Sequence, residues 1–331
     1  MDLLSSDAQV AYLDHAATSP LRREVAAAMA PYGSERFGNA SGAHRVARDA
    51  RQALEDARDE VADLLGSAPG EIVFTAGGTE ADNLAVLGTL AARNSAIEGA
   101  AIVCSAIEHA AVLRSCEAAA SAAARVSGIG RLDLRLAPVD RHGVVELSGL
   151  EQALGPEVLL VSVMLANNEV GTVQPIKAIA DLVRAAAPAA VLHTDAVQAA
   201  AFLDLASLAA DADLISVSAH KLGGPKGAGA LVVRQGVELR PILHGGGQER
   251  ERRSGTHDVA SAVGLAAALR TATAMRPCEV TRVSALRDRL ADGLLGAVAG
   301  TVETAPRRLV LPGHCHLRFV GVEQEELLVL L

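Results

Sequence analysis

Two positions near the middle of the chain carry side chains of complementary chemistry. Asp195 follows the apolar run 189–192, and Lys221 follows a second apolar run, 213–217, just before a glycine-rich turn. In an open α/β sheet, ligands bind where the strands end. A lysine held there, partly desolvated and beside other cations, has a lowered pKa and can serve as a Schiff-base amine. The spacing therefore predicts a strand-end site that combines an amine with a carboxylate.

This pair of groups suits pyridoxal 5′-phosphate (PLP). The aldehyde of PLP needs a lysine, and an aspartate opposite the pyridinium nitrogen keeps that nitrogen protonated and the ring an electron sink. Taken singly, Lys221 and Lys226 fit surface lysines of a loop, and Asp195 fits a helix cap. A PLP site is favoured because Asp195 lies at one strand end and Ser218-Ala219-His220-Lys221 at another.

Further sequence blocks carry a family resemblance from Tyr12 to the final leucines. They are residues 12–18, 37–41, 71–83, 108–109, 167–171 and 253–256. In these blocks the chain resembles the cysteine desulfurases of the class V aminotransferase group, which are PLP enzymes of the aspartate aminotransferase fold (fold type I). The resemblance implies a large PLP-binding domain of residues 16–258 and a smaller, incomplete α+β domain of residues 259–331, against which residues 1–15 pack.

The glycine-rich segment 75–80 lies between a strand-like run and a helical pattern. Glycines there let backbone N–H groups approach a phosphate, and a helix N-terminus adds a favourable dipole. Taken alone, Gly-Gly-Thr also suits an ordinary strand-to-helix turn. By resemblance, four residues hold the cofactor phosphate, and Thr256 contacts the phosphate bound by the neighbouring subunit of a homodimer. The four are Gly78, Thr79, Ser218 and His220.

Other residues match family positions around the ring and the substrate. His109 matches a histidine that stacks on the ring and transfers protons, roles that suit a pKa near neutrality, although a lone histidine is more often structural. Asn168 and Gln198 match side chains near the phenolic oxygen of the ring, with loop hydrogen bonding as the alternative. Asn39 matches a residue near the substrate carboxylate, and an asparagine in a turn explains it nearly as well.

By resemblance, the reaction converts L-cysteine to L-alanine. Lys221 removes the α-proton, His109 transfers protons and Asp195 stabilises the protonated ring. A protein thiolate then attacks the substrate sulfur and becomes a persulfide, from which sulfur passes to an acceptor protein. An iron–sulfur scaffold and a sulfur carrier are both candidates for that acceptor. Another class V enzyme (an aminotransferase or a selenocysteine lyase) and an inactive PLP-binding scaffold for sulfur-transfer proteins are the alternatives.

The family's sulfur-accepting cysteine lies just beyond the segment that resembles 322–331, and an arginine for the substrate carboxylate comes later still. Because the sequence stops at Leu331, we expect a truncated protein with little sulfur transfer. Its four cysteines are scattered, without a C-x-x-C pair, which argues against a disulfide framework and a zinc site. Strand alternation places His314 and His316 opposite Cys315, so we expect no metal site there either.

Composition narrows the class of protein. Half of the 331 residues are apolar and only 2% are aromatic, as expected for helices layered on a parallel sheet. The net charge of −9 argues against a nucleic-acid partner. Residues 1–7 lack the features of a signal peptide, and no apolar run has membrane-spanning length. We therefore expect a cytoplasmic protein.

Strand-like runs alternate with helical stretches, which predicts a mostly parallel sheet with helices on both faces. These runs are 71–74, 101–104, 158–163, 189–192, 214–217 and 229–233. Apolar residues at three- and four-residue spacings predict an amphipathic helix over 46–64 that ends at Gly66. After Asp258 the pattern predicts two helices, 259–275 and 283–298, with a break at Pro277. The run 315–320 is typical of a strand of the smaller domain.

Overall fold

The computed structural model describes residues 11–93, 99–123 and 132–330. Its main element is a seven-stranded sheet of order β1-β7-β6-β5-β4-β2-β3. Strand β7 runs antiparallel to β1 and β6, and the other neighbouring strands are parallel. The carboxyl ends of all strands except β7 therefore meet at one edge. The strands are β1 (Ile72–Thr75), β2 (Ala101–Ser105), β3 (Asp133–Ala137), β4 (Val158–Ser162), β5 (Val191–Asp195), β6 (Leu214–Ser218) and β7 (Gly229–Val233).

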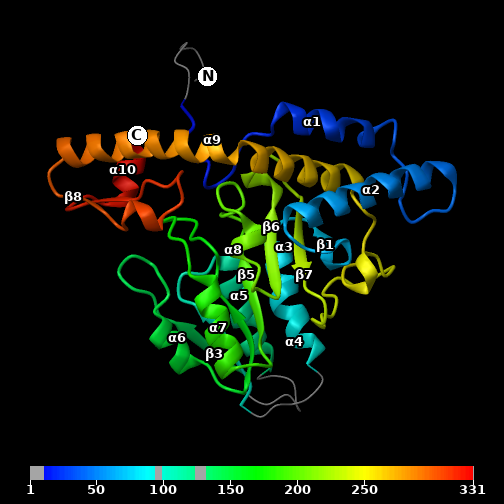
Figure 1. The fold of residues 1–331 in the computed structure, drawn as a ribbon, viewed down its shortest axis with the longest axis horizontal. Helices are drawn as coiled ribbons and strands as arrows, with labels where there is room; N and C mark the ends of the chain where they lie inside the picture. Colours follow the sequence, from blue (N-terminus) through cyan, green and yellow to red (C-terminus); the bar gives the residue numbers. More distant parts are fainter. Residues whose placement is uncertain (1–10, 94–98, 124–131, 331) are drawn as a thin grey trace.

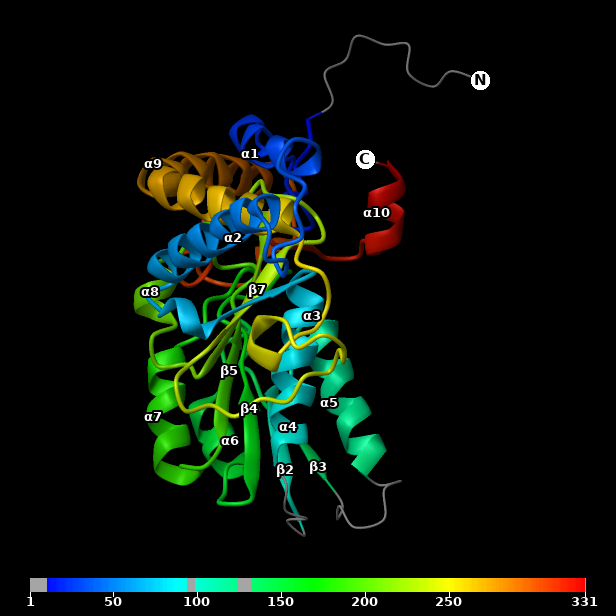
Figure 2. The ribbon, with the colours of Figure 1, turned by 90° about the vertical axis from the view of Figure 1, so that its right-hand side faces the viewer.

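Helices cover both faces of this sheet, which confirms the predicted α/β fold. Figure 2 shows α3, α4 and α5 on one face and α7 on the other. The α-helices are α1 (Arg23–Met29), α2 (Arg45–Leu64), α3 (Gly78–Asn83), α4 (Thr89–Ala92), α5 (Ala110–Ala123), α6 (Leu147–Ala153), α7 (Ile176–Ala186), α8 (Leu205–Leu208), α9 (Val259–Ala297) and α10 (Gln324–Leu330). Short helical turns are η1 (Ala30–Gly33), η2 (Pro69–Glu71), η3 (Leu84–Gly88), η4 (Ala219–Lys221), η5 (Glu249–Glu251) and η6 (Arg307–Leu309).

The strand side chains divide the core into two layers. Ile102 and Cys104 of β2 pack with helices α3 and α5, whereas Ala101 and Val103 belong to the layer that includes α2, α7 and the first part of α9. This follows from the pleat, which directs successive side chains to opposite faces. Because both faces are buried, most residues of the central strands are apolar, although β5 ends in His193, Thr194 and Asp195, and this is why their sequences stand out.

The expected break at Pro277 is wrong. Residues 259–297 form one helix of 39 residues with this proline inside it, and in Figure 1 the helix runs from the small sheet of β8 to the helices α1 and α2. A proline removes one backbone donor and costs roughly 3 kcal/mol in a helix interior. The first part of α9 packs against α1 and α2, and Thr281 Oγ1 donates to the Pro277 carbonyl at 3.1 Å. We infer that this packing holds the helix together across the proline.

A smaller antiparallel sheet near the C-terminus pairs β8 (Thr301–Glu303) with β9 (Leu317–Phe319), and α10 follows it (Figure 1). Strand β9 lies inside the predicted run 315–320. Of the segment 1–15 that was expected to pack here, residues 1–10 lie outside the described residues. The domain division at 258/259 stays a prediction. In the described part of the chain, no helix has both the length and the apolar character needed to cross a bilayer.

Candidate active site

A cavity of about 680 Å³ opens at the sheet edge where the parallel strands end. Each predicted residue that lines it follows a strand: the turn 76–79 follows β1, His109 follows β2, Asn168 follows β4, and the segments 195–198 and 218–221 follow β5 and β6. The structure therefore brings together most of the residues that the sequence singles out. These are Gly78, Thr79, His109, Asn168, Asp195, Gln198, Ser218, His220 and Lys221.

Two predicted residues lie elsewhere in the chain. Asn39 is exposed, and its Oδ1 accepts a hydrogen bond from the Ser41 backbone N–H at 3.0 Å, which agrees with an asparagine in a turn. Thr256 is exposed and lines a separate cavity of about 250 Å³. The predicted role of Thr256 is a contact with the neighbouring subunit. The roles of Asn39 and Thr256 both stay predictions.

Lys221 lies in η4, directly after β6. Its Nζ donates a hydrogen bond of 2.7 Å to Oε1 of Gln198. Burial lowers the pKa of Lys221, and the charges of Asp195 and Asp14 oppose this only in part. A lowered pKa increases the fraction of neutral amine, which is the nucleophilic form. Lys226 also lines the cavity but is exposed.

Asp195 ends β5 at the floor of the cavity, where it is 5% exposed. Its Oδ1 accepts a hydrogen bond of 2.8 Å from the Val197 backbone N–H. Burial raises the pKa of the Asp195 carboxyl, while the Val197 N–H and the charges of His109 and Lys221 act in the other direction. A buried carboxylate of this kind favours a positively charged partner inside the cavity.

Asp82 adds a second carboxyl at the floor, one that the sequence analysis missed. Burial and the charge of Asp195 raise the pKa of Asp82 well above its ordinary value. Its Oδ1 has no hydrogen-bond partner among the described residues. The nearby His193 offers no positive charge, because burial lowers its pKa to about 3. In the sequence, the sign that Asp82 belongs to the site is its position three residues after Thr79, which places both on one helix face.

Two lysines, Lys221 and Lys226, also line this cavity. Burial and then the charges of Lys221 and Lys226 lower the pKa of His220, which indicates a positive potential that favours an anion. In the turn before α3, Gly77 has a φ of 128°, and a Cβ on Gly78 would lie 2.7 Å from a methyl carbon of Val197. Glycine alone satisfies both positions.

The donor set fits PLP. The carboxyl groups of Asp82 and Asp195 complement a protonated ring nitrogen. The positive charge near His220 complements a phosphate, and Lys221 supplies an amine in the same cavity. Within this floor, one potential ligand atom from each of Asp82, His109 and Asp195 lies within 4.8 Å of the others. The absence of a metal stays a prediction.

The family model described as aminotransferase class-V matches residues 11–331. The chain belongs to the class V aminotransferase family. It is 40% identical over 328 residues to the cysteine desulfurase IscS of Methanosarcina thermophila, covering 99% of this chain and 78% of that protein. It is 43% identical over 327 residues to the IscS-like cysteine desulfurase of Mycobacterium tuberculosis, covering 97% of this chain and 80% of that protein.

Solved structures agree with this assignment. A NifS-like protein superimposes with a TM-score of 0.85 at 34% identity, over 92% of this chain and 80% of that one. A structure of SspA in complex with cysteine gives a TM-score of 0.70 at 37% identity, over 79% and 72% of the two chains. The comparisons confirm the predicted resemblance to cysteine desulfurases and the fold type I architecture.

The cysteines of this class V chain lie away from the cavity. Cys104 and Cys116 are buried in β2 and α5, Cys278 is exposed on α9, and Cys315 is half-buried. Burial raises the pKa of the Cys315 thiol, which disfavours its thiolate. Among the described residues that line the cavity there is no cysteine.

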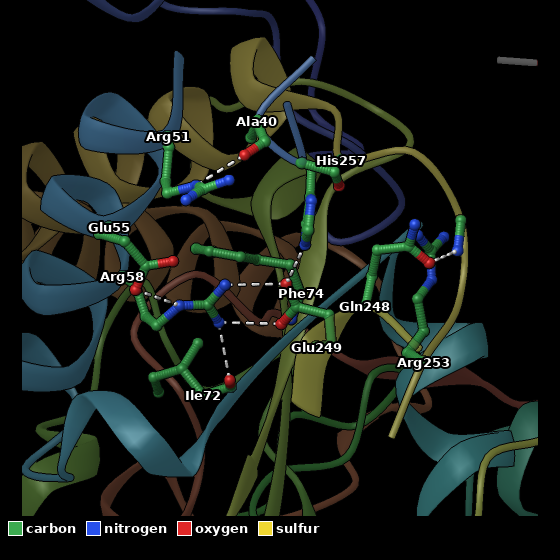
Figure 3. A network of polar contacts seen from close by, with 12 residues as sticks. Ala40, Arg51, Glu55, Arg58, Ile72, Phe74, Gln248, Glu249, Arg253 and His257 are labelled. Atoms are coloured by element: carbon green, nitrogen blue, oxygen red, sulfur yellow. Dashed lines mark hydrogen bonds and ion pairs between the residues drawn. The ribbon is translucent and has the colours of Figure 1, made fainter. Parts of the chain in front are cut away.

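A buried ionic cluster lies beside the turn 76–79 (Figure 3). The carboxylate of Glu249 accepts two hydrogen bonds of 2.8 Å from the Arg58 guanidinium and one of 2.9 Å from the Phe74 backbone N–H. Nε2 of His257 lies 3.0 Å from the same carboxylate. The side chains of Arg58 and Glu249 are 3% and 1% exposed, so the pair is fully desolvated.

This cluster predicts an acid-sensitive contribution to stability. Burial raises the pKa of Glu249, but Arg58, His257 and the Phe74 N–H outweigh burial and lower it from 4.5 to about 2. The depressed pKa stabilises the fold above about pH 4.5, and this contribution is lost as the pH falls towards 2. We expect it to be about 3 kcal/mol. Urea unfolding of wild type and Glu249→Gln between about pH 5 and pH 2.5 measures it, and equal pH slopes would contradict it.

Proposed function

We propose that this chain is a PLP-dependent cysteine desulfurase. The reaction converts L-cysteine to L-alanine and passes the sulfur to a protein thiolate as a persulfide. The observation that supports this most strongly is the meeting of Lys221, Asp195 and the turn 76–79 in one cavity. Relatives named cysteine desulfurases and a similar structure solved in complex with cysteine support the choice of substrate.

When bound, PLP would supply an electron sink for the carbon from which the α-proton is removed. Lys221 holds the cofactor aldehyde and then carries that proton on Nζ, a task that suits its lowered pKa. Asp195 would hold the proton of the ring nitrogen. Asn168 and Gln198 would contact the phenolic side of the ring, and the phosphate would be held by Gly78, Thr79, Ser218 and His220.

His109 is the proposed proton carrier of the cavity. It is exposed, and its Nδ1 accepts a hydrogen bond of 3.1 Å from the Ala111 backbone N–H. In the neutral ring the proton therefore resides on Nε2. This arrangement fixes the ring orientation and leaves one nitrogen for exchange with the substrate. Asn39 is proposed to act on the substrate carboxylate.

We also propose a homodimer in which Thr256 of one subunit contacts the cofactor phosphate of the other. Its exposure and its position outside the main cavity of its own chain support this arrangement. We expect sedimentation velocity of the PLP-loaded protein at low concentration to give a dimer. A stable monomer that holds PLP tightly would contradict it. We further propose that a second protein accepts the sulfur and that this chain acts in the cytoplasm.

Product analysis tests the function. With L-cysteine and dithiothreitol, a desulfurase releases alanine and sulfide in equal amounts and keeps the cofactor in its aldehyde form. An aminotransferase would instead accumulate the pyridoxamine form with L-alanine, and an inactive scaffold would bind PLP without forming either product. Selenocysteine in a parallel assay identifies a selenocysteine lyase. Accumulation of the pyridoxamine form overturns the proposal, and so does PLP binding with neither product.

A further inference from the structure

The loop 243–256, between β7 and α9, contains an unusual backbone. Three consecutive residues other than glycine have positive φ angles: 49° at Glu249, 57° at Arg250 and 64° at Glu251. Side chains disfavour this region, and such strain persists only where the surrounding structure imposes it. Strained segments of this kind concentrate at ligand-binding sites, so the contacts that hold the loop are informative.

The buried carboxylate of Glu249 holds the loop from inside. It is bonded to Arg58 of α2, to the Phe74 backbone in β1 and to His257, as Figure 3 shows. The two arms of the loop are also bonded to each other. Gln248 Oε1 accepts a hydrogen bond of 2.9 Å from the Gly255 N–H. The loop is therefore one connected unit with a single buried anchor among its described residues.

This unit reaches the main cavity through Arg253. Its Nε donates to Oε1 of Glu80 at 2.8 Å, and its Nη2 donates to Oε2 at 3.3 Å. Oε2 of Glu80 in turn accepts a hydrogen bond of 2.7 Å from the Ala76 backbone N–H. Ala76 is the first residue of the turn 76–79 that lines the cavity. From Glu249 the link to Arg253 is the loop backbone, in which the Arg252 N–H donates to the Glu249 carbonyl at 3.1 Å, and side-chain contacts continue from Arg253 through Glu80 to the proposed phosphate site.

We propose that Glu249 is a positioning residue for the cofactor phosphate, acting through Arg253 and Glu80 on the backbone of the turn 76–79. The inference rests on the proposed function, because the anion in question is the phosphate of PLP. Backbone donors bind an anion well only when they are already oriented, since a mobile turn loses conformational entropy on binding. Loosening the anchor is expected to weaken phosphate recognition and to leave the contacts with the ring intact.

The test compares the affinities of the apoprotein for PLP and for pyridoxal, which lacks the phosphate. We expect Glu249→Gln to weaken PLP binding about tenfold and to leave pyridoxal binding unchanged. The direction of the change in PLP affinity is informative. Removing a negative charge near an anion would by itself strengthen PLP binding, so a loss of affinity reports on positioning. Arg253→Lys, which keeps the positive charge but loses the two-point contact with Glu80 and leaves the buried cluster intact, is expected to reduce the same affinity ratio.

Glu60→Gln is the matched control, because Glu60 pairs with Arg270 on the exposed surfaces of α2 and α9, outside the loop. Thermal unfolding of each apoprotein verifies folding, and Arg253→Lys decides the matter if Glu249→Gln does not fold. Equal losses of PLP and pyridoxal affinity, or an unchanged ratio in a folded variant, would overturn the inference. Failure of the wild type to bind PLP would instead overturn the proposed function.

Discussion

Replacement of Lys221 by alanine is expected to abolish the covalent attachment of PLP and to lower L-cysteine turnover at least about a thousandfold. Nζ of Lys221 contacts Gln198 at 2.7 Å inside the cavity, and its pKa is lowered by burial. The variant loses both the amine that binds the aldehyde and the base for the α-proton. Visible absorption of the PLP-loaded protein and steady-state alanine formation measure the two losses.

Lys226→Ala is the matched control for this prediction. Lys226 lines the same cavity but is exposed, so it lacks the burial that favours the neutral, nucleophilic amine of Lys221. We expect this variant to retain the visible absorption. Borohydride reduction followed by peptide mass mapping locates the adduct in the wild type. An adduct on Lys226, or a Lys221→Ala variant with wild-type turnover, would sink the assignment.

The central strands could be predicted because they are buried on both faces, and continuous apolar runs mark them directly. Strand β3 was missed. It lies at the edge of the sheet, paired only with β2, and its polar residues Asp133 and Arg135 interrupt the apolar run. The helix across Pro277 was misjudged for a related reason: the packing of α9 against α1 and α2 is tertiary information, which outweighs a local helix breaker.

The candidate site likewise contains residues that could be predicted from the sequence and residues that could not. Lys221 and Asp195 follow strands, so their meeting at one sheet edge could be inferred from the fold class. The pairing of Arg58 with Glu249 joins residues 191 positions apart, and each alone reads as an ordinary surface charge. Asp82 was missed because a carboxylate on a helix is usually exposed to solvent. Burial, which decides its role, has no signature in a single sequence.

Asp195→Asn is expected to lower turnover by about 10²–10³ while PLP remains bound. The amide keeps the size of the carboxyl group and leaves the phosphate contacts untouched. It cannot carry the negative charge that holds a proton on the ring nitrogen, so the bound cofactor becomes a weaker electron sink. Alanine formation from L-cysteine, normalised to the PLP content measured by absorbance, separates this loss from a loss of cofactor.

Asp82→Asn supplies the control, because it introduces the same change at the neighbouring carboxyl of the floor. Burial and the charge of Asp195 already raise the pKa of Asp82 well above its ordinary value, which favours its neutral, protonated form, and an amide imitates that form closely. We expect this variant to lose less than about tenfold in turnover. Equal losses in the two variants would mean that the floor acts as one shared acid. A wild-type rate in Asp195→Asn would remove Asp195 from the mechanism, because a ring nitrogen without a charged partner would then suffice.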